Sequence, residues 1–422
     1  MSGKKFTRFG PVAAEWPIIR LREVIRERAK WIEIDDNTLY QRVTARVRNQ
    51  GIEPRDRVLG SYVKTKRQKL CKADDLLVAE IDAKVGGFGL VPTEGDGAIV
   101  SGHYFLFEID QARVALNWLD HVIRDGRLQR QVDAVGSTNY AAIRPRDVGA
   151  FQMPLPPLAE QRAIAEVLGA VEDAIAKAEA LCFQLHEAVE ELAEALFIGL
   201  DPGSGHKNVD GWRASTLAAE MASIQVGIVV KPASYYVKTD GVPALRSLNV
   251  RPNRLFLGEL VQISQEGHRL NAKSALRAGD VVTIRTGEPG KTAFIPDGIG
   301  DINCIDVIFS RPSSWLRGEY VSFFMNSRIA KRQIAVLQGG LAQQHLNVGE
   351  MKRIKITVPP LAYQDNAVEL LNGAWARIEA EEVTLERLKS LRAALSQELL
   401  SGRIRLPDSM IARHRDKAGQ AA

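Results

Sequence analysis

The feature that most constrains this chain is an amphipathic stretch between residues 154 and 199. After its opening prolines it contains no further proline, and its apolar side chains recur in alternating steps of three and four, the spacing of one helix face. Its principal apolar positions are Ile164, Leu168, Val171, Ile175, Leu185, Leu192 and Leu196. At roughly 1.5 Å per residue such a helix is about 60 Å long. We therefore expect it to bridge two bodies and to pack along a partner.

An internal repeat predicts that partner. The sequence PPLAEQ at residues 156–161 returns as PPLAYQ at residues 359–364, and the shift of 203 persists without a gap to the glycine that ends each stretch. The second stripe is formed by Leu371, Ile378, Leu385, Leu388, Leu395 and Leu399. Glu381 and Arg392 interrupt it. The repeat predicts two long helices that pair antiparallel as a coiled coil, with these two charges at the edge of the seam or against a third partner.

Composition favours a soluble protein of several units. The chain has 422 residues, of which 45% are hydrophobic, and its three cysteines, Cys71, Cys182 and Cys304, are isolated from one another. The seven histidines show no ligand spacing with them, so we expect neither a disulfide framework nor a metal site. The N-terminal residues lack the apolar core of a signal peptide, and no apolar run has the length of a membrane span. A cytoplasmic location is predicted.

Charge is distributed unevenly along the chain. Residues 1–157 carry 25 Lys and Arg against 20 Asp and Glu, and residues 200–357 carry 20 against 13. The first long helix, residues 158–199, carries 2 against 9, and residues 358–404 carry 5 against 7. Basic lobes attached to an acidic helix indicate that the lobes, rather than the helix, meet a polyanion such as nucleic acid.

Both lobes combine short strands with helices. In the first lobe we predict strands within 76–82, 89–92 and 98–110, and a helix within 113–132 that stops at an Asp-Gly pair. Residues 276–296 of the second lobe align with residues 70–92, and one late helix is expected over 321–337. This pattern predicts an α+β fold. The predicted boundaries are lobes at 1–153 and 201–356, long helices at 154–200 and 357–404, and a basic, flexible tail at 405–422.

These residues resemble the specificity subunit of type I restriction-modification systems. The resemblance extends from Trp16 to about Ile404 and is strongest in PLPPLAEQRAIAEVL and its repeat, with LRAGDVV and GGLAQQHLN in the second lobe as support. The second copy departs from the pattern, because Tyr363 stands where the first has Glu160. The resemblance implies an α+β protein with two globular target recognition domains separated by two long antiparallel coiled-coil helices, internally duplicated about a pseudo-two-fold axis.

The function implied by this resemblance is DNA recognition without catalysis. Each lobe of such a protein reads one half of a bipartite target in double-stranded DNA. The helices set the spacer between the halves and bind two modification (methyltransferase) subunits, which carry S-adenosylmethionine. Motor-nuclease restriction subunits complete those complexes that also cleave DNA. The resemblance thus implies no cofactor in this chain itself.

Side chains suited to DNA contact are clustered within the lobes. Lys and Arg neutralise phosphates, whereas Arg, Asn and Gln can make bidentate contacts with base edges. Any single one of them is equally consistent with an ordinary soluble surface. The candidates of the first lobe are Arg42, Arg46, Arg48, Lys64, Lys66, Arg67, Lys69 and Lys84, and those of the second are Arg246, Asn249, Arg251, Asn253, Arg254, Lys291, Gln343, Gln344 and His345.

Two alternatives stay open from the residues alone. Asp82 and Lys84 have the spacing of a carboxylate and a lysine in a metal-dependent nuclease, although the second lobe lacks the set. A coiled-coil scaffold without DNA binding is the other. The GEPGKT string at 287–292 lacks the first glycine of a phosphate-binding loop, since Arg285 occupies that position, and a hairpin turn is expected instead. The Asn/Asp-Pro-Pro-aromatic string of adenine methyltransferases does not occur.

Overall fold

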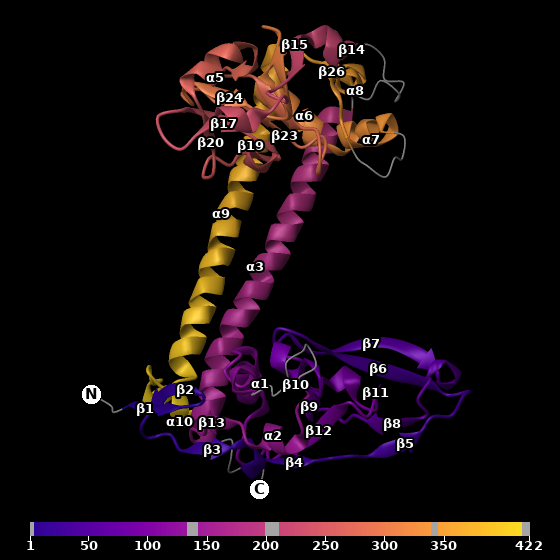
Figure 1. Ribbon diagram of the computed structural model, residues 1–422, viewed down its shortest axis with the longest axis vertical. Helices are drawn as coiled ribbons and strands as arrows, with labels where there is room; N and C mark the ends of the chain where they lie inside the picture. Colours follow the sequence, from indigo (N-terminus) through magenta and orange to yellow (C-terminus); the bar gives the residue numbers. More distant parts are fainter. Residues whose placement is uncertain (1–3, 133–141, 199–210, 339–344, 416–422) are drawn as a thin grey trace. The chain divides into compact units, whose positions relative to one another are not determined.

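The computed structural model describes residues 4–132, 142–198, 211–338 and 345–415. The chain divides into two compact units: unit 1 consists of residues 1–178 and 384–422, and unit 2 of residues 179–383. The long helices α3 (Leu158–Ile198) and α9 (Leu361–Leu399) each contribute a segment to both units. Each unit is therefore one lobe together with a pair of helix segments (Figure 1).

The lobe of unit 1 is built on two sheets. A four-stranded antiparallel sheet has the order β10-β9-β12-β4, and a five-stranded sheet has the order β5-β8-β11-β6-β7. In the second sheet β11 and β6 are parallel, with Ile99 opposite Arg42, and the other pairs are antiparallel. The strands are β4 (Ile25–Glu27), β5 (Trp31–Glu33), β6 (Leu39–Arg46), β7 (Gly51–Leu59), β8 (Arg67–Leu70), β9 (Leu76–Ala79), β10 (Phe88–Leu90), β11 (Ile99–Val100) and β12 (Tyr104–Ile109).

The lobe of unit 2 shares most of this topology, but the outermost strand of its larger sheet lies at the opposite edge, since β16 pairs with β20 whereas β5 pairs with β8. Its four-stranded antiparallel sheet has the order β15-β25-β22-β23, and its five-stranded sheet has the order β16-β20-β17-β24-β21. Here β17 and β24 form the parallel pair, and antiparallel strands flank it on both sides, as in unit 1. The strands are β15 (Met221–Val226), β16 (Tyr236–Val237), β17 (Val242–Leu245), β20 (Val261–Ile263), β21 (Ala275–Leu276), β22 (Val281–Ile284), β23 (Thr292–Phe294), β24 (Ile302–Cys304) and β25 (Val307–Pro312).

Short elements connect each lobe to the long helices. In unit 1, β3 pairs with β13 directly before α3, and in unit 2, β14 pairs with β26 directly before α9. The β1–β2 and β18–β19 hairpins complete the strands. The bounds are β1 (Lys4–Thr7), β2 (Gly10–Ala13), β3 (Ile18–Arg20), β13 (Gln152–Pro154), β14 (Arg213–Thr216), β18 (Val250–Arg251), β19 (Arg254–Leu255) and β26 (Lys355–Val358). The shorter helices are α1 (Leu116–Arg124), α2 (Pro145–Gly149), α4 (Leu217–Glu220), α5 (Gln265–Leu270), α6 (Gly318–Asn326), α7 (Arg328–Leu337), α8 (Val348–Arg353) and α10 (Asp408–Ala412).

The helix after the last sheet strand differs between the two lobes. In unit 1, α1 ends before the predicted Asp-Gly stop, where Gly126 adopts φ +78° and turns the chain away. In unit 2 the single predicted helix is wrong, because the chain breaks at Ser327 into α6 and α7. The extended backbone of Ser327 (ψ 158°) ends α6, and its hydroxyl accepts a hydrogen bond from the Ala330 amide as the N-cap of α7. A buried cap of this kind overrides the continuous helical pattern.

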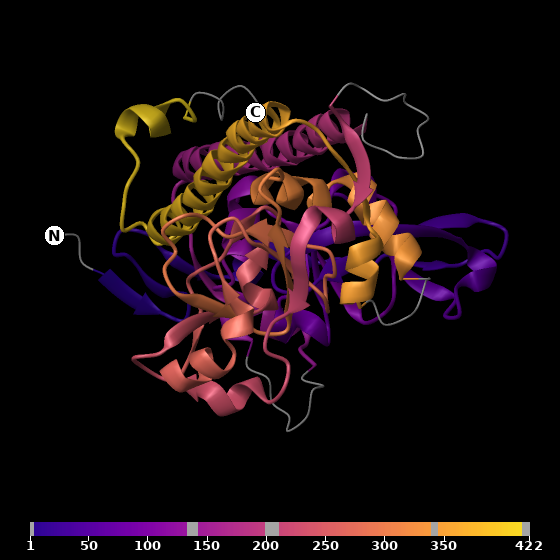
Figure 2. The same cartoon turned by 90° about the horizontal axis from the view of Figure 1, so that it is seen from above.

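The long helices run antiparallel and lie side by side (Figures 1 and 2). In unit 1 the Arg392 guanidinium of α9 contacts Glu172 of α3, and in unit 2 the Tyr363 hydroxyl near the start of α9 donates to the Leu196 carbonyl near the end of α3. Their apolar faces continue into the core of each lobe. In unit 1 that core includes Leu168, and in unit 2 it includes Leu371. The predicted α+β fold with two lobes and two long antiparallel helices is confirmed.

Candidate nucleic-acid interface

The two helix-start motifs hold each lobe to its helix in the same way. The Gln161 side chain, fully buried, donates to the carbonyls of Pro156 (2.8 Å) and Arg113 (2.9 Å) and accepts from the amide of Ala115 (2.8 Å). Because Ala115 caps α1, this one amide joins the proline turn, the α1 loop and the first turn of α3.

The second copy of the repeat reproduces this arrangement, and we call the buried glutamine with its three hydrogen bonds the latch. Gln364, also fully buried, donates to the carbonyls of Pro359 (2.8 Å) and Trp315 (3.0 Å) and accepts from the amide of Arg317 (2.8 Å), which caps α6. Each of the two glutamines bonds both a donor and two acceptors, which only a carboxamide can do at neutral pH. The latch is a physical reason for the presence of glutamine at this position in both copies.

The departure at Tyr363 has a structural counterpart as well. In unit 1 the nearly buried Glu160 carboxylate accepts from the Trp16 indole (3.2 Å) and from the Arg405 guanidinium (2.6 and 2.9 Å). In unit 2 Tyr363 packs edge-on against Trp212, with ring centroids 4.7 Å apart. The two tryptophans that open the lobes thus meet the same helix position, one by a hydrogen bond and the other by aromatic packing.

The charged residues that interrupt the second stripe are paired within the chain. Arg392 donates twice to Glu172 of α3 (2.7 and 3.1 Å), and Glu381 pairs with Arg377 one turn earlier on α9 (2.6 Å). His121 lies 3.6 Å from Glu172, and together His121 and Arg392 hold the pKa of Glu172 at about 2 against the opposing effect of burial. Arg392 therefore bridges the two helices, whereas Glu381 is satisfied locally.

The predicted helix-pairing residues all lie away from open solvent. Fully buried are Ile164, Leu168, Leu371, Ile378 and Leu399. Half-buried are Val171, Ile175, Leu185, Leu192, Leu196, Leu385, Leu388 and Leu395. Burial is greatest where a helix segment also contacts a lobe, as expected for a two-helix seam that is joined at each end to a larger core.

In the first lobe, the β6–β7 hairpin presents basic side chains that are matched by acidic ones on the adjacent strand. Arg42 on β6 binds Asp56 on β7 through two hydrogen bonds (2.7 and 2.5 Å), and this lowers the pKa of Asp56. Arg46 pairs with Glu53 (2.6 Å), while Arg48 lies exposed in the turn at φ +61°. A polyanion would have to compete with these carboxylates for the two strand arginines.

The basic run from Lys64 to Lys69 separates into exposed and buried members. Lys64 is exposed, and Lys66 contacts Asp36. Lys69 is only 5% exposed: its ammonium donates to the carbonyl of Tyr104 (2.7 Å), and burial lowers the pKa of this group. Gln68 beside it on β8 is buried as well, and within that strand Arg67 is the exposed residue. Lys69 therefore supports the lobe, whereas Arg67 faces solvent.

An aromatic residue that sequence reasoning missed lies beside this run. Trp31 on the edge strand β5 is 38% exposed, and its ring is 4.8 Å from the Arg67 guanidinium and 5.1 Å from the Lys69 ammonium. The signal available in the sequence was the pairing of an isolated tryptophan with a basic strand. Such a cation-aromatic pair at a sheet edge is suited to contact with a nucleic-acid strand. Lys84 is also exposed, in the turn after β9, where its carbonyl accepts from Gln129.

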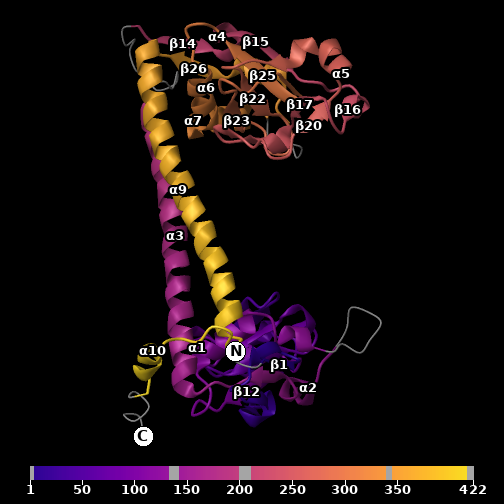
Figure 3. The ribbon, with the colours of Figure 1, turned by 90° about the vertical axis from the view of Figure 1, so that its left-hand side faces the viewer.

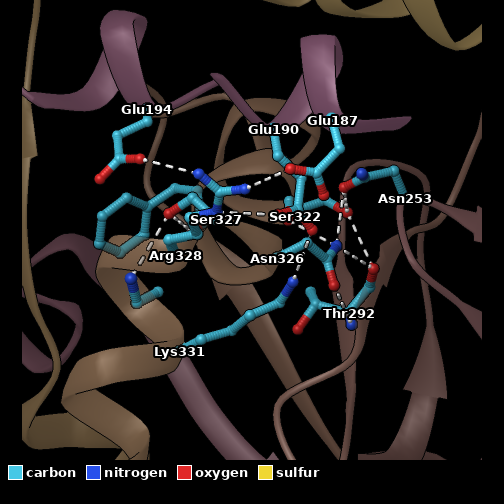
Figure 4. Close-up of polar contacts among 12 residues, drawn as sticks. Glu187, Glu190, Glu194, Asn253, Thr292, Ser322, Asn326, Ser327, Arg328 and Lys331 are labelled. Carbon is cyan, nitrogen blue, oxygen red and sulfur yellow. Dashed lines mark hydrogen bonds and ion pairs between the residues drawn. The ribbon is translucent and has the colours of Figure 1, made fainter. Parts of the chain in front are cut away.

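In the second lobe, two of the candidates are parts of the scaffold. Asn249 is fully buried; it accepts from the Arg246 amide (2.9 Å) and donates to the Phe256 carbonyl (3.0 Å). Asn253, at φ +61°, accepts from Ser322 (3.1 Å) and Asn326 (2.7 Å) of α6, as Figure 4 shows. Their side-chain oxygens are thus engaged in holding the β18–β19 turn.

The arginines of this group point in different directions. Arg254 pairs with Glu379 (2.7 Å) and Glu382 (3.5 Å) on α9, which ties the turn to the long helix. Arg251 is exposed, with its guanidinium 5.9 Å from the Phe256 ring, and Arg246 is half-buried. Among the arginines of the second lobe's candidate set, Arg251 is therefore the most accessible to a ligand.

The remaining candidates lie near the β22–β23 hairpin. β22 and β23 are antiparallel, which confirms a hairpin turn at residues 287–292. Lys291 in this turn pairs with Glu288. His345 is hydrogen-bonded to Arg285 (3.0 Å) and Thr286 (3.2 Å). Gln343 and Gln344 lie outside the described residues.

The nuclease residues do not form a metal site in the part of the chain that the structure describes. Asp82 and Lys84 both lie exposed in a short 3-10 turn, and Asp75, an acidic residue that precedes β9, is buried and paired with Arg28. Burial raises the pKa of Asp75, an effect that Arg28 opposes. Within the described residues no group of three or more His, Cys, Asp or Glu side chains could hold a metal ion. None of the described helices is long and apolar enough to cross a membrane.

Comparisons with known proteins agree with this arrangement. The chain is 23% identical over 270 residues to the type I restriction enzyme MjaVIII specificity subunit of Methanocaldococcus jannaschii, a match covering 61% of this chain and 63% of that protein. It is 21% identical over 215 residues to the EcoKI specificity subunit of Escherichia coli, covering 48% and 44%. The chain thus spans less than two thirds of the length of the curated relatives it matches. No protein-family signature matches it.

Solved structures extend the likeness of the fold to nearly the whole chain. One chain from a structure concerned with assembly and conformational transition of the type I restriction-modification system matches with a TM-score of 0.61 and 21% identity, over 93% of this chain and 99% of that one. The type I S subunit from M. genitalium matches with a TM-score of 0.54 and 13% identity, over 91% and 96%. The resemblance to type I specificity subunits is confirmed in sequence and in fold.

Proposed function

We propose that this chain is the non-catalytic DNA-recognition subunit of a cytoplasmic type I restriction-modification complex. Each lobe reads one half of a bipartite target in double-stranded DNA, and α3 and α9 set the length of the spacer between the halves. The lobes correspond to residues 1–153 and 201–356, the helices to 154–200 and 357–404, and the tail to 405–422. S-adenosylmethionine enters with two modification subunits that bind the helices, and motor-nuclease subunits bind where the system also cleaves DNA.

The observation that carries this proposal is the duplication of a complete working unit. Both lobes have a four-stranded antiparallel sheet and a five-stranded sheet with one internal parallel pair. Both are held to a long helix by a buried glutamine that makes the same three kinds of hydrogen bond. The side chains exposed on the two lobes differ. Two lobes with similar folds but different exposed side chains suit a protein that reads two different half-sites on one duplex.

Basic residues at the lobe surface supply the attraction to DNA. In unit 1 the exposed members include Arg48, Lys64, Lys84 and Arg67, the last beside Trp31, and in unit 2 they include Arg251. Phosphate contacts of this kind fix the position of a protein on the duplex, and their number sets the salt dependence of binding. Residues held in the scaffold, such as Asn249, act instead by shaping the surface.

Methylation mapping tests this function directly. The chain is expressed with its modification subunit in a host that lacks adenine methylation, and the methylated sites are sequenced. We expect one split motif with two unlike halves around an unspecified spacer. A continuous motif, or methylation that is the same without this chain, contradicts the proposal. Incubation of the purified chain with plasmid and Mg²⁺ should leave the plasmid intact, and cleavage that Asp82→Asn abolishes would favour a nuclease instead.

A further inference from the structure

A pocket lined by arginines lies in unit 1, and none of the candidate DNA-binding side chains is part of its lining. The β1–β2 hairpin, the segment after α1 and the C-terminal end of α9 enclose a cavity of about 550 Å³. Its charged lining consists of Arg8, Arg127, Arg130, Arg403 and Asp125, four cations against one carboxylate. We name this cavity the arginine pocket.

Arg127 forms the fixed floor of the arginine pocket. Its side chain is 6% exposed, its guanidinium lies 5.1 Å from the Phe9 ring, and it donates to the Gln397 carbonyl of α9 (3.1 Å). Its Nε is 2.5 Å from Asp125, so the single carboxylate of the pocket is already engaged. An ordered guanidinium of this kind is ready to bind an anion without losing much side-chain entropy.

The rim arginines add charge of the same sign. Arg130 is 67% exposed and lies 4.0 Å from Asp125, while Arg403 pairs with Glu398 outside the pocket lining (2.5 Å). Burial lowers the pKa of Arg127; Asp125 opposes this effect, and Arg130 and Arg403 reinforce it. The cations of the pocket therefore repel one another, and an added anion would relieve that repulsion.

In unit 2 the cations at the corresponding position, after the helix that follows the lobe's last sheet strand, are paired with carboxylates. Arg328, at the start of the segment that follows α6, contacts Glu190 (2.9 Å), Glu187 (3.3 Å) and Glu194 (3.5 Å) on successive turns of α3, as Figure 4 shows. Lys331 reaches Glu190 at 3.5 Å. In this copy a row of carboxylates on α3 neutralises the cations of α7, which follows α6. Figure 3 shows α7 next to the helix pair at that end.

The first copy lacks that row of carboxylates. At a shift of 203, the three glutamates of α3 correspond to Ser390, Ala393 and Gln397 of α9. Ala393 and Gln397 both line the arginine pocket. The repeat has thus kept the basic segment after the lobe helix in both units, while the acidic helix face is present only in unit 2.

We propose that the arginine pocket binds carboxylates from an acidic segment of a partner protein, which supplies from outside what α3 supplies within unit 2. Under the function proposed above, on which this identification rests, the partner is the modification subunit. Guanidinium groups bind carboxylates through paired, charge-assisted hydrogen bonds. The phosphates of a duplex lie on a convex surface and do not reach an arginine that is 6% exposed at the floor of a cavity. A carboxylate side chain on a protein helix or chain terminus can enter the cavity and reach this arginine.

The first test removes the rim charges. In the full chain, Arg8→Gln, Arg130→Gln and Arg403→Gln are combined, and affinity for the modification subunit is measured by calorimetry. Loss of several charge-assisted contacts should weaken binding about ten-fold or more. Affinity for a target DNA duplex should stay unchanged.

A matched variant controls for overall charge. Arg22, Arg26 and Arg146 are exposed arginines of the same unit outside the pocket lining, and their replacement by Gln changes the net charge equally. We expect wild-type affinity for the modification subunit from this control. Equal weakening by both triple variants, or wild-type affinity in the pocket variant, overturns the proposal. A loss of DNA affinity in the pocket variant with partner affinity intact identifies a nucleic-acid phosphate as the occupant, and likewise overturns it.

A second variant tests the pocket without removing an arginine. Ala393→Glu together with Gln397→Glu places carboxylates where unit 2 has Glu190 and Glu194. Both positions are exposed on α9, so the fold should accept them. The new carboxylates should occupy the pocket, weaken the modification subunit about ten-fold and leave DNA binding unchanged. Unaltered partner affinity contradicts the proposal.

A peptide probe separates failure of this site from failure of the proposed function. A fluorescent peptide of residues 184–197 carries the three glutamates that face Arg328, and its twin carries Gln at those positions. The acidic peptide should bind the wild-type chain about ten-fold more tightly than the pocket variant or the twin does. Equal binding by both peptides excludes a carboxylate site. If the wild-type chain binds no modification subunit, the proposed function fails, and this titration still decides the pocket.

Discussion

The latch glutamines offer the sharpest test of how each lobe is held to its helix. Gln161 is fully buried and makes three hydrogen bonds, and Gln161→Leu keeps the side-chain size while it removes all three. One amide and two carbonyls then lose their partner. At about 1 kcal/mol for each hydrogen bond, with a larger cost where the remaining group stays buried, the change should destabilise this region by about 3 kcal/mol.

That free energy is best measured as local opening. Because the protein has two units, a single unfolding transition cannot be assumed, and amide hydrogen exchange reports on each unit separately. Exchange over residues 113–124 should accelerate roughly a hundred-fold in Gln161→Leu, as about 3 kcal/mol implies. The internal counterpart Gln364→Leu should act instead on residues 315–326. Each variant should leave the other unit at its wild-type rate.

A surface glutamine on the same helix serves as the control. Gln184 is exposed on α3, and Gln184→Leu should leave exchange in both regions unchanged. The stabilising role of these hydrogen bonds is refuted if residues 113–124 keep their wild-type protection in Gln161→Leu. It is also refuted if Gln184→Leu loosens them to the same degree, since the effect would then come from a leucine on α3 and not from the lost hydrogen bonds.

Three further predictions concern pH, DNA binding and the spacer. His121 and Arg392 hold the pKa of Glu172 at about 2, below its ordinary 4.5, so the stability that this carboxylate contributes is complete above pH 4.5 and is lost as pH falls toward 2. Because the carboxylate is 35% exposed, the free energies of unfolding of wild type and Glu172→Gln should differ by only about 1–2 kcal/mol at neutral pH. The thermal melting temperatures of the two proteins should converge in acid. The double variant Lys64→Ala, Arg67→Ala should lower the affinity for DNA equally for all sequences, and it should reduce the slope of log affinity against log salt concentration by about 2. An unchanged slope would show that neither side chain contacts phosphate. Insertion of four residues at the middle of both α3 and α9 adds about 6 Å to each helix and nearly preserves its apolar face. Methylation mapping should then show unchanged half-sites with a spacer longer by one or two base pairs. Altered half-sites with a constant spacer would contradict this expectation.

The sequence by itself was sufficient for the architecture. Helical periodicity and a gap-free repeat are properties that a chain displays without reference to its fold, because 3.6 residues per turn maps sequence spacing directly onto one face. The long antiparallel helices, the duplicated α+β lobes and the hairpin at residues 287–292 were therefore predicted correctly. The helix break at Ser327 was missed, because a capping hydroxyl depends on the backbone that surrounds it and not on periodicity.

The tertiary structure alone decided which charges are available. Lys64 and Lys69 lie five residues apart, yet one is exposed and the other is 5% exposed beneath Trp31, because pairing of β5 with β8 determines what covers each strand face. Arg392 finds Glu172 across 220 residues of sequence. Ion pairing and burial depend on neighbours that the chain brings together only on folding, so composition could locate basic lobes but could not distinguish a scaffold lysine from a ligand-binding one.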